Sequence, residues 1–118
     1  MSKIIATKAI KGAYKIVERA ELMVEKAVKE RGKELVLTFP DTAYYLPFIY
    51  AMTGVKVQKL GDVLPILEHA RSLLPPVPTE ELWLPYLGDT LDAGMATLFA
   101  EEIIEVLKYA TENPPPTH

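Results

Sequence analysis

Apolar residues recur every three or four positions through the first quarter of the chain, and this spacing predicts one long helix over residues 3–31. Gly32 should end this helix, because Lys29 and Arg31 suit its negative end and glycine adopts the left-handed conformation found there. Small residues on the apolar face indicate close approach of a neighbouring helix. The expected buried line is Ile5, Ala9, Gly12 or Ala13, Ile16, Ala20, Met23 and Ala27, flanked by Ile10, Tyr14, Val17, Val24 and Val28.

A second helix is predicted within residues 43–53, followed by Gly54 as its terminator. Asp41 and Thr42 are both suitable N-cap residues for it. Pro47 lies inside this segment and requires either a kinked helix or a turn before a shorter one.

Two further helices and a single turn complete the helical pattern. A helix over 63–74 should be capped by Asp62 and ended by the prolines that follow, and residues 79–81 indicate one capped turn. The last helix is expected over 89–111, with Glu101, Glu102 and Glu105 away from its buried side. That side is predicted to hold Leu91, Met95, Leu98 or Phe99, Ile103, Val106 or Leu107 and Ala110.

Residues 35–38 and 55–59 are the two candidate strands, because both are short and rich in branched apolar residues. With the helix between them they could form a βαβ unit, or both could be extended connectors. The sequence thus predicts a mainly α domain of about four to five helices, with or without a short parallel β pair around residues 35–59.

Residues 42–55 contain no charged residue but several aromatic ones, which predicts a segment covered on most sides. Phe48, Ile49 and Met52 are expected in the core, facing the first and last helices. Tyr44 and Tyr45 are expected to anchor that core through their hydroxyl groups.

Composition limits the possible functions. A chain of 118 residues is one domain, and a net charge of −3 gives no attraction to nucleic acid or to an anionic membrane. The sequence shows neither an apolar run of about 20 residues nor a signal peptide, so a cytoplasmic location is expected. The chain has no cysteine, which excludes a disulfide, a thiol nucleophile and a cysteine-held iron–sulfur cluster within it.

Motifs for chemistry are absent from the sequence. There is no glycine-rich phosphate loop and no nucleophile elbow, and the two histidines are isolated, so no catalytic, cofactor-binding or metal-binding residue is predicted. The exception left open is a cluster of Asp41, Tyr44 and Tyr45, which could act as a base beside phenol donors in a small ligand-binding domain. The alternative is that Asp41 caps a helix and both tyrosines are structural.

Two features suggest a surface for a protein partner. Lys8, Lys11 and Lys15, with Lys3, precede the first acidic residue of the first helix, and they form either a solvated face or a patch for an acidic partner. The connector containing Trp83 and Tyr86 is apolar, so it either folds onto the core or is exposed for a partner. The predicted partner-binding residues are Lys8, Lys11, Lys15, Trp83 and Tyr86.

One longer match concerns the charge-poor stretch and its flanks. Phe-Pro-Asp-Thr-Ala-Tyr-Tyr-Leu-Pro occupies residues 39–47, and Gly54, Leu-Gly-Asp at 60–62 and Pro-Ile-Leu at 65–67 follow in order. This order resembles a segment near the start of the acetyl-CoA synthase subunit of the CO dehydrogenase/acetyl-CoA synthase complex. Residues 100–109 are similar to a second block of that family, whereas Tyr86 to Asp92 is extra length.

The resemblance implies a helical N-terminal domain over residues 1–112, with the proline-rich residues 113–118 as a linker to a downstream domain. The family forms acetyl-CoA from CO, a methyl group and CoA at a nickel–iron–sulfur cluster in the C-terminal part of the subunit. This chain would then have no cofactor and no activity of its own. It would dock the CO dehydrogenase subunit, contact the rest of the synthase chain and help enclose a CO tunnel. A free-standing helical adaptor is the alternative.

Overall fold

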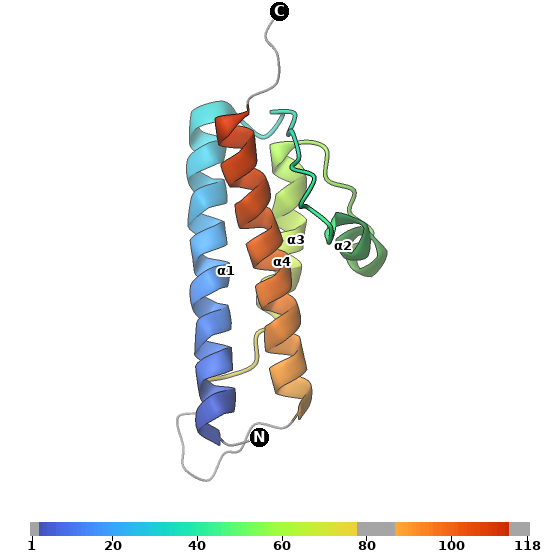
Figure 1. Cartoon of the computed structure of the whole chain (residues 1–118). Helices are drawn as coiled ribbons and strands as arrows, with labels where there is room; N and C mark the ends of the chain where they lie inside the picture. Colours follow the sequence, from blue (N-terminus) through green and yellow to red (C-terminus); the bar gives the residue numbers. More distant parts are fainter. Residues whose placement is uncertain (1–2, 78–86, 114–118) are drawn as a thin grey trace, which may run out of the picture.

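The computed structural model describes residues 3–77 and 87–113, which form four α-helices and one short 3₁₀ turn. The elements are α1 (Lys3–Arg31), α2 (Leu46–Thr53), the 3₁₀ turn η1 (Leu60–Asp62), α3 (Val63–Leu73) and α4 (Leu87–Glu112). Helices α1 and α4 lie side by side and run in the same direction, and α3 packs against both in the opposite direction (Figure 1). The short helix α2 projects from the side of this bundle. The predicted mainly α fold is confirmed.

Helix α1 spans the predicted residues, but its buried face is rotated from the expected line. Ala9 and Gly12 are exposed, whereas Ala13 and Ala20 are buried as predicted, and Ile10, Val17 and Val24 of the flanking stripe are buried with them. The reason is that α1 contacts both α3 and α4, so its buried face widens toward the larger branched residues. Gly32 ends the helix with φ 84°, as expected. The fully buried residues are Ile10, Ala13, Val17, Ala20 and Val24.

Helix α4 supplies the other half of the core. Phe99, Ile103, Val106, Leu107 and Ala110 are buried as predicted. Two expectations are wrong: Leu91 is 62% exposed, and Glu102 is 3% exposed. Glu102 lies three residues after Phe99 and four residues before Val106, which is about one helical turn from each. This spacing places it on the same buried face despite its charge.

The two strand candidates do not form a parallel pair. They meet in an isolated antiparallel bridge between Val36 and Lys59, and the Leu37 amide donates to the Gln58 carbonyl at 3.0 Å. A parallel pair requires a crossover that packs over the strands, whereas α2 lies to the side of the bundle (Figure 1). These residues are therefore the extended connectors of the alternative interpretation.

Asp62 has a different role from the one predicted. It stands at the N-cap position of α3, but its carboxylate makes no cap bond to that helix. It accepts hydrogen bonds from the amides of Lys59 and Gln58, both at 2.9 Å, and these bonds lower its pKa. Asp62 thus fixes the turn that leads into α3.

Candidate partner-binding surface

Helix α2 begins later than Asp41 or Thr42 would place it. Its first residue is Leu46, and Pro47 occupies the first turn, where a missing N–H breaks no helical bond. The N-cap residue is Tyr45, which makes no side-chain cap bond, so the predicted caps Asp41 and Thr42 are wrong. Gly54 ends the helix with φ 74°, as predicted.

Only one residue of α2 is fully buried. Ile49 is 0% exposed and belongs to the main core, which confirms that it is buried, although α2 has its main helix contact with α3 rather than with the first and last helices. Phe48 is 39% exposed and touches the core with one side of its ring, whose centroid lies 6.4 Å from that of Phe99. Met52 is 50% exposed, so its predicted core position is wrong. The buried face of α2 is centred on Ile49 and includes half-buried Leu46 and Thr53, so Phe48 and Met52 lie toward its solvent side.

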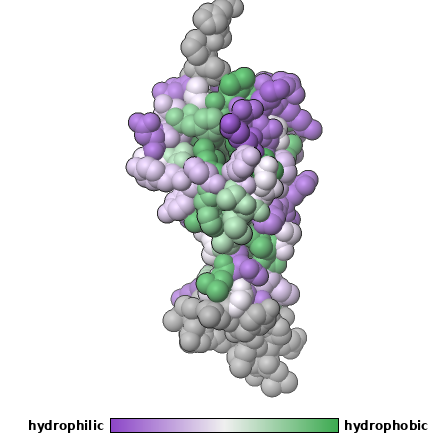
Figure 2. Space-filling view, turned by 90° about the vertical axis from the view of Figure 1, so that its right-hand side faces the viewer, coloured by the Kyte–Doolittle hydropathy of each residue, from purple (hydrophilic) through white to green (hydrophobic). Residues whose placement is uncertain are grey.

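The other large side chains of this segment face outward. Tyr44 is 73% exposed, and Tyr45 and Tyr50 are each 50% exposed, so the prediction that tyrosines anchor the core is wrong. Figure 2 looks onto the side of the molecule that carries α2 and shows apolar residues gathered over its middle, with hydrophilic residues at the margins. We call the residues Tyr44, Tyr45, Phe48, Tyr50 and Met52 the aromatic surface.

Two carboxylates of α4 hold the start of this segment in place. The Tyr45 amide donates to Glu102 Oε2 at 2.8 Å, and the Thr42 hydroxyl donates to Glu105. Burial raises the pKa of Glu102, the Tyr45 amide opposes that effect, and the charge of Glu105 adds to it. Sequence reasoning missed Glu102 because it placed Glu101, Glu102 and Glu105 together on the side of the helix away from the core.

Beside Tyr45, these carboxylates line a pocket of about 230 Å³. Its walls are Tyr45, Gly94, Thr97, Leu98, Glu101, Glu102 and Glu105. Asp41 and Tyr44 do not line it and are exposed, so the Asp41/Tyr44/Tyr45 cluster is not gathered into one pocket in the described part of the chain. The geometry gives no support to a base paired with phenol donors there.

The lysines predicted to bind a partner lie on another part of the molecule. Lys8, Lys11 and Lys15 are exposed on the first half of α1, whereas α2 projects from the opposite side of the bundle, beyond α4 and α3 (Figure 1). Trp83 and Tyr86 fall outside the described residues. The role predicted for these five residues therefore stays a prediction.

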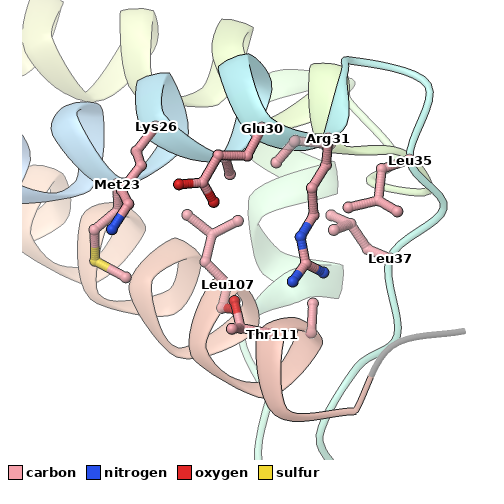
Figure 3. Close-up of a pocket in the computed structure, with 11 residues that line it drawn as sticks. Met23, Lys26, Glu30, Arg31, Leu35, Leu37, Leu107 and Thr111 are labelled. Atoms are coloured by element: carbon pink, nitrogen blue, oxygen red, sulfur yellow. The ribbon is translucent and has the colours of Figure 1, made fainter.

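A second pocket, of about 240 Å³, lies at the end of the bundle where α1 and α4 both finish. Figure 3 shows Lys26, Glu30 and Arg31 around its opening, with Leu35, Leu37 and Leu107 on the apolar walls. Thr111, which also lines it, donates its hydroxyl to the Leu107 carbonyl at 2.9 Å. This pocket can receive an apolar group, and the Thr111 hydroxyl in its lining is bonded to a backbone carbonyl rather than to the Glu30 carboxylate.

Residues 3–77 and 87–113 contain no group of three or more acidic or histidine side chains placed to hold a metal ion. No helix in this part of the chain combines the length and apolarity needed to span a membrane. The described residues thus form a small helical domain that carries an exposed aromatic surface.

Comparison with known proteins identifies the family. The chain belongs to the family described as the carbon monoxide dehydrogenase subunit alpha N-terminal domain, which matches residues 21–110. It is 39% identical over 103 residues to the carbon monoxide dehydrogenase/acetyl-CoA synthase subunit alpha of Moorella thermoacetica. It is 30% identical over 93 residues to the acetyl-CoA decarbonylase/synthase complex subunit beta 1 of Methanocaldococcus jannaschii.

The two alignments cover most of this chain and little of each relative. They span 87% and 79% of the chain but only 13% and 11% of the respective relatives. The similarity therefore concerns one domain of much longer polypeptides. The resemblance deduced from residues 39–67 and 100–109 is confirmed.

Proposed function

We propose that this domain is the non-catalytic N-terminal part of a CO-methylating acetyl-CoA synthase subunit, and that its aromatic surface docks the CO dehydrogenase subunit. The observation that carries the proposal is the exposure of five large aromatic or apolar side chains on one charge-free segment. A patch of this kind on a small domain marks a protein contact, because leaving it in water loses the free energy that its burial would release. Tyrosines suit such contacts, since each offers a large apolar ring with a polar tip.

The attachment of α2 also suits a docking element. Helices of eight residues are marginal alone, so α2 depends on Ile49, the Phe48–Phe99 contact and the Tyr45–Glu102 hydrogen bond. These anchors are all on its inner side and leave the outer side free. A partner would then meet a surface already held in one position, which lowers the entropy cost of binding.

The proposal extends to the path of CO within the assembled complex. An uncharged, apolar contact between this domain and its neighbours would help enclose a dry route for a small uncharged gas. The nickel–iron–sulfur cluster of the synthase would be held by the remainder of the subunit, because this chain has no cysteine to ligate it. The domain alone should give no CO–CoA exchange above background, and nickel-dependent exchange by the isolated domain would refute this part.

The docking proposal is tested with the full-length subunit and purified CO dehydrogenase by surface plasmon resonance. Tyr44→Ala combined with Tyr50→Ala removes two exposed rings and should weaken binding about tenfold or more, mainly through faster dissociation. Leu22→Ala is the matched control, since Leu22 is 66% exposed on α1, away from α2. Thermal melting should show both variants folded.

Unchanged affinity in the tyrosine variant would place the docking surface elsewhere. The lysines provide the alternative: Lys8→Glu with Lys11→Glu should slow association if the start of α1 forms the rim of the contact. Trp83→Ala tests the connector in the same assay. A loss confined to these variants would return the interface to the residues predicted from sequence.

A further inference from the structure

Three carboxylates of α4 stand beside the aromatic surface without a cation. Glu101, Glu102 and Glu105 line the pocket next to Tyr45. The ion pairs recorded for the described residues join Lys29 to Glu25, Lys59 to Glu34 and Arg71 to Glu21, and none of them includes these three. Thr42 and Tyr45, which donate hydrogen bonds to Glu105 and Glu102, belong to the charge-free residues 42–55, so no positive charge on that side neutralises the carboxylates.

This arrangement is unfavourable for the free domain. Like charges three or four residues apart on a helix repel one another, as Glu101 and Glu102 both do with Glu105. Glu102 is also 3% exposed, and an acid removed from water is costly to ionise. Burial and the neighbouring Glu105 raise the pKa of Glu102, consistent with that cost. A positive charge supplied from outside would relieve both effects.

We propose that the aromatic surface and the α4 carboxylates form one composite docking site, and that the partner seats an arginine in the pocket between Tyr45 and Glu101, Glu102 and Glu105. This inference rests on the proposed function and specifies the chemistry of the partner's surface: an apolar centre beside a basic rim. A partner for this site carries positive charge, whereas a partner for the α1 lysines would carry negative charge.

Arginine fits the pocket better than other cations. Its planar guanidinium can stack on the exposed ring of Tyr45 while it donates paired hydrogen bonds to a carboxylate. The pocket of about 230 Å³ has apolar walls at Leu98 and Gly94 that can receive the methylene stem of a long side chain. A metal ion would not use such a stem-and-ring arrangement, and the described residues offer no metal-holding group.

The test uses the full-length subunit and CO dehydrogenase, with association and dissociation measured over a range of salt concentrations. Glu101→Gln with Glu105→Gln should slow association about tenfold at low salt and flatten its salt dependence, because these charges steer the encounter. Glu101→Lys with Glu105→Lys should reduce the association rate further. Glu18→Gln with Glu25→Gln is the control, since both residues are exposed on α1 and the charge change is the same.

The outcomes separate this inference from the docking proposal. Suppose that Tyr44→Ala with Tyr50→Ala weakens binding, but Glu101→Gln with Glu105→Gln behaves like its control. The aromatic surface then docks the partner, and the proposed arginine contact is refuted. If neither variant affects binding, both proposals fail. Glu102→Gln provides a further check, because it keeps an acceptor for the Tyr45 amide yet removes the buried charge. It should speed dissociation, and an unchanged dissociation rate would exclude Glu102 from the site.

Discussion

Glu102 combines a buried carboxylate, a backbone amide donor and an acidic neighbour one helical turn away. Its pKa in the folded domain lies above the ordinary value of 4.5, so folding favours its protonated form. The stability it contributes is therefore fully present below pH 4.5 and is lost as the pH rises through the higher pKa of the folded state.

Glu102→Gln should consequently be neutral or stabilising at pH 7, by about 0.2–0.5 kcal/mol from the lost repulsion with Glu105 alone. Below the ordinary glutamate pKa, the stabilities of variant and wild type should converge, since both side chains are then uncharged. Urea unfolding at pH 4 and pH 7 measures the difference at each pH. A variant that is less stable at pH 7 and equal at pH 4 would show that the ionised carboxylate stabilises the fold.

Neighbouring residues of α2 should respond very differently to truncation. Ile49 is 0% exposed in the core, so Ile49→Ala should cost about 2–5 kcal/mol. Met52 is 50% exposed, so Met52→Ala should change stability by about 0.5 kcal/mol or less. Chemical denaturation followed by circular dichroism distinguishes them, and equal costs would mean that α2 sits in the core with a different rotation.

At the scale of the elements, a glycine within α1 and the glycine that follows it provide a matched comparison. Gly32 has φ 84°, so Gly32→Ala should destabilise the domain by about 1–2 kcal/mol through backbone strain. Gly12 lies within the helix, and a methyl group there meets no atom within 4 Å, so Gly12→Ala should stabilise by about 0.5–1 kcal/mol. Opposite shifts in the melting temperature are expected, and shifts of the same sign would contradict this account of where α1 ends.

The positions of the helices could be predicted from sequence because they depend on local patterns. Periodicity and a terminal glycine were sufficient for α1, and Gly54 marked the end of α2. The placement of α2 could not be predicted, because aromatic residues can either form a core or be held for a partner. Glu102 illustrates the same limit: its charge indicated solvent, whereas its position relative to Phe99 required burial.

At the scale of the whole molecule, α1 and α4 form the largest contact between helices, and small residues are buried in the core on both. Ala20, Ala96 and Ala100 are each 0% exposed in the main core, where added side-chain volume must displace packed neighbours. Ala20→Leu should therefore separate the helices and cost about 1–3 kcal/mol. Ala9→Leu, on the exposed side of α1, should stay within about 0.5 kcal/mol of wild type in the same unfolding experiment. Similar costs for both would contradict the close packing of α1 against α4.

The pairing of the first long helix with the last also has a consequence during synthesis. Helix α1 finds its largest contact with α4, which follows about 80 residues later in the chain. At ordinary translation rates, α4 emerges from the ribosome on the order of ten seconds after α1, and the apolar stripe of α1 stays uncovered until then. During this interval α1 is an amphipathic helix whose apolar face is not yet covered by α4, and exposed apolar faces of this kind are bound by chaperones. The parallel arrangement therefore makes folding of the bundle a late event on the ribosome, completed only after residue 112 has left the exit tunnel.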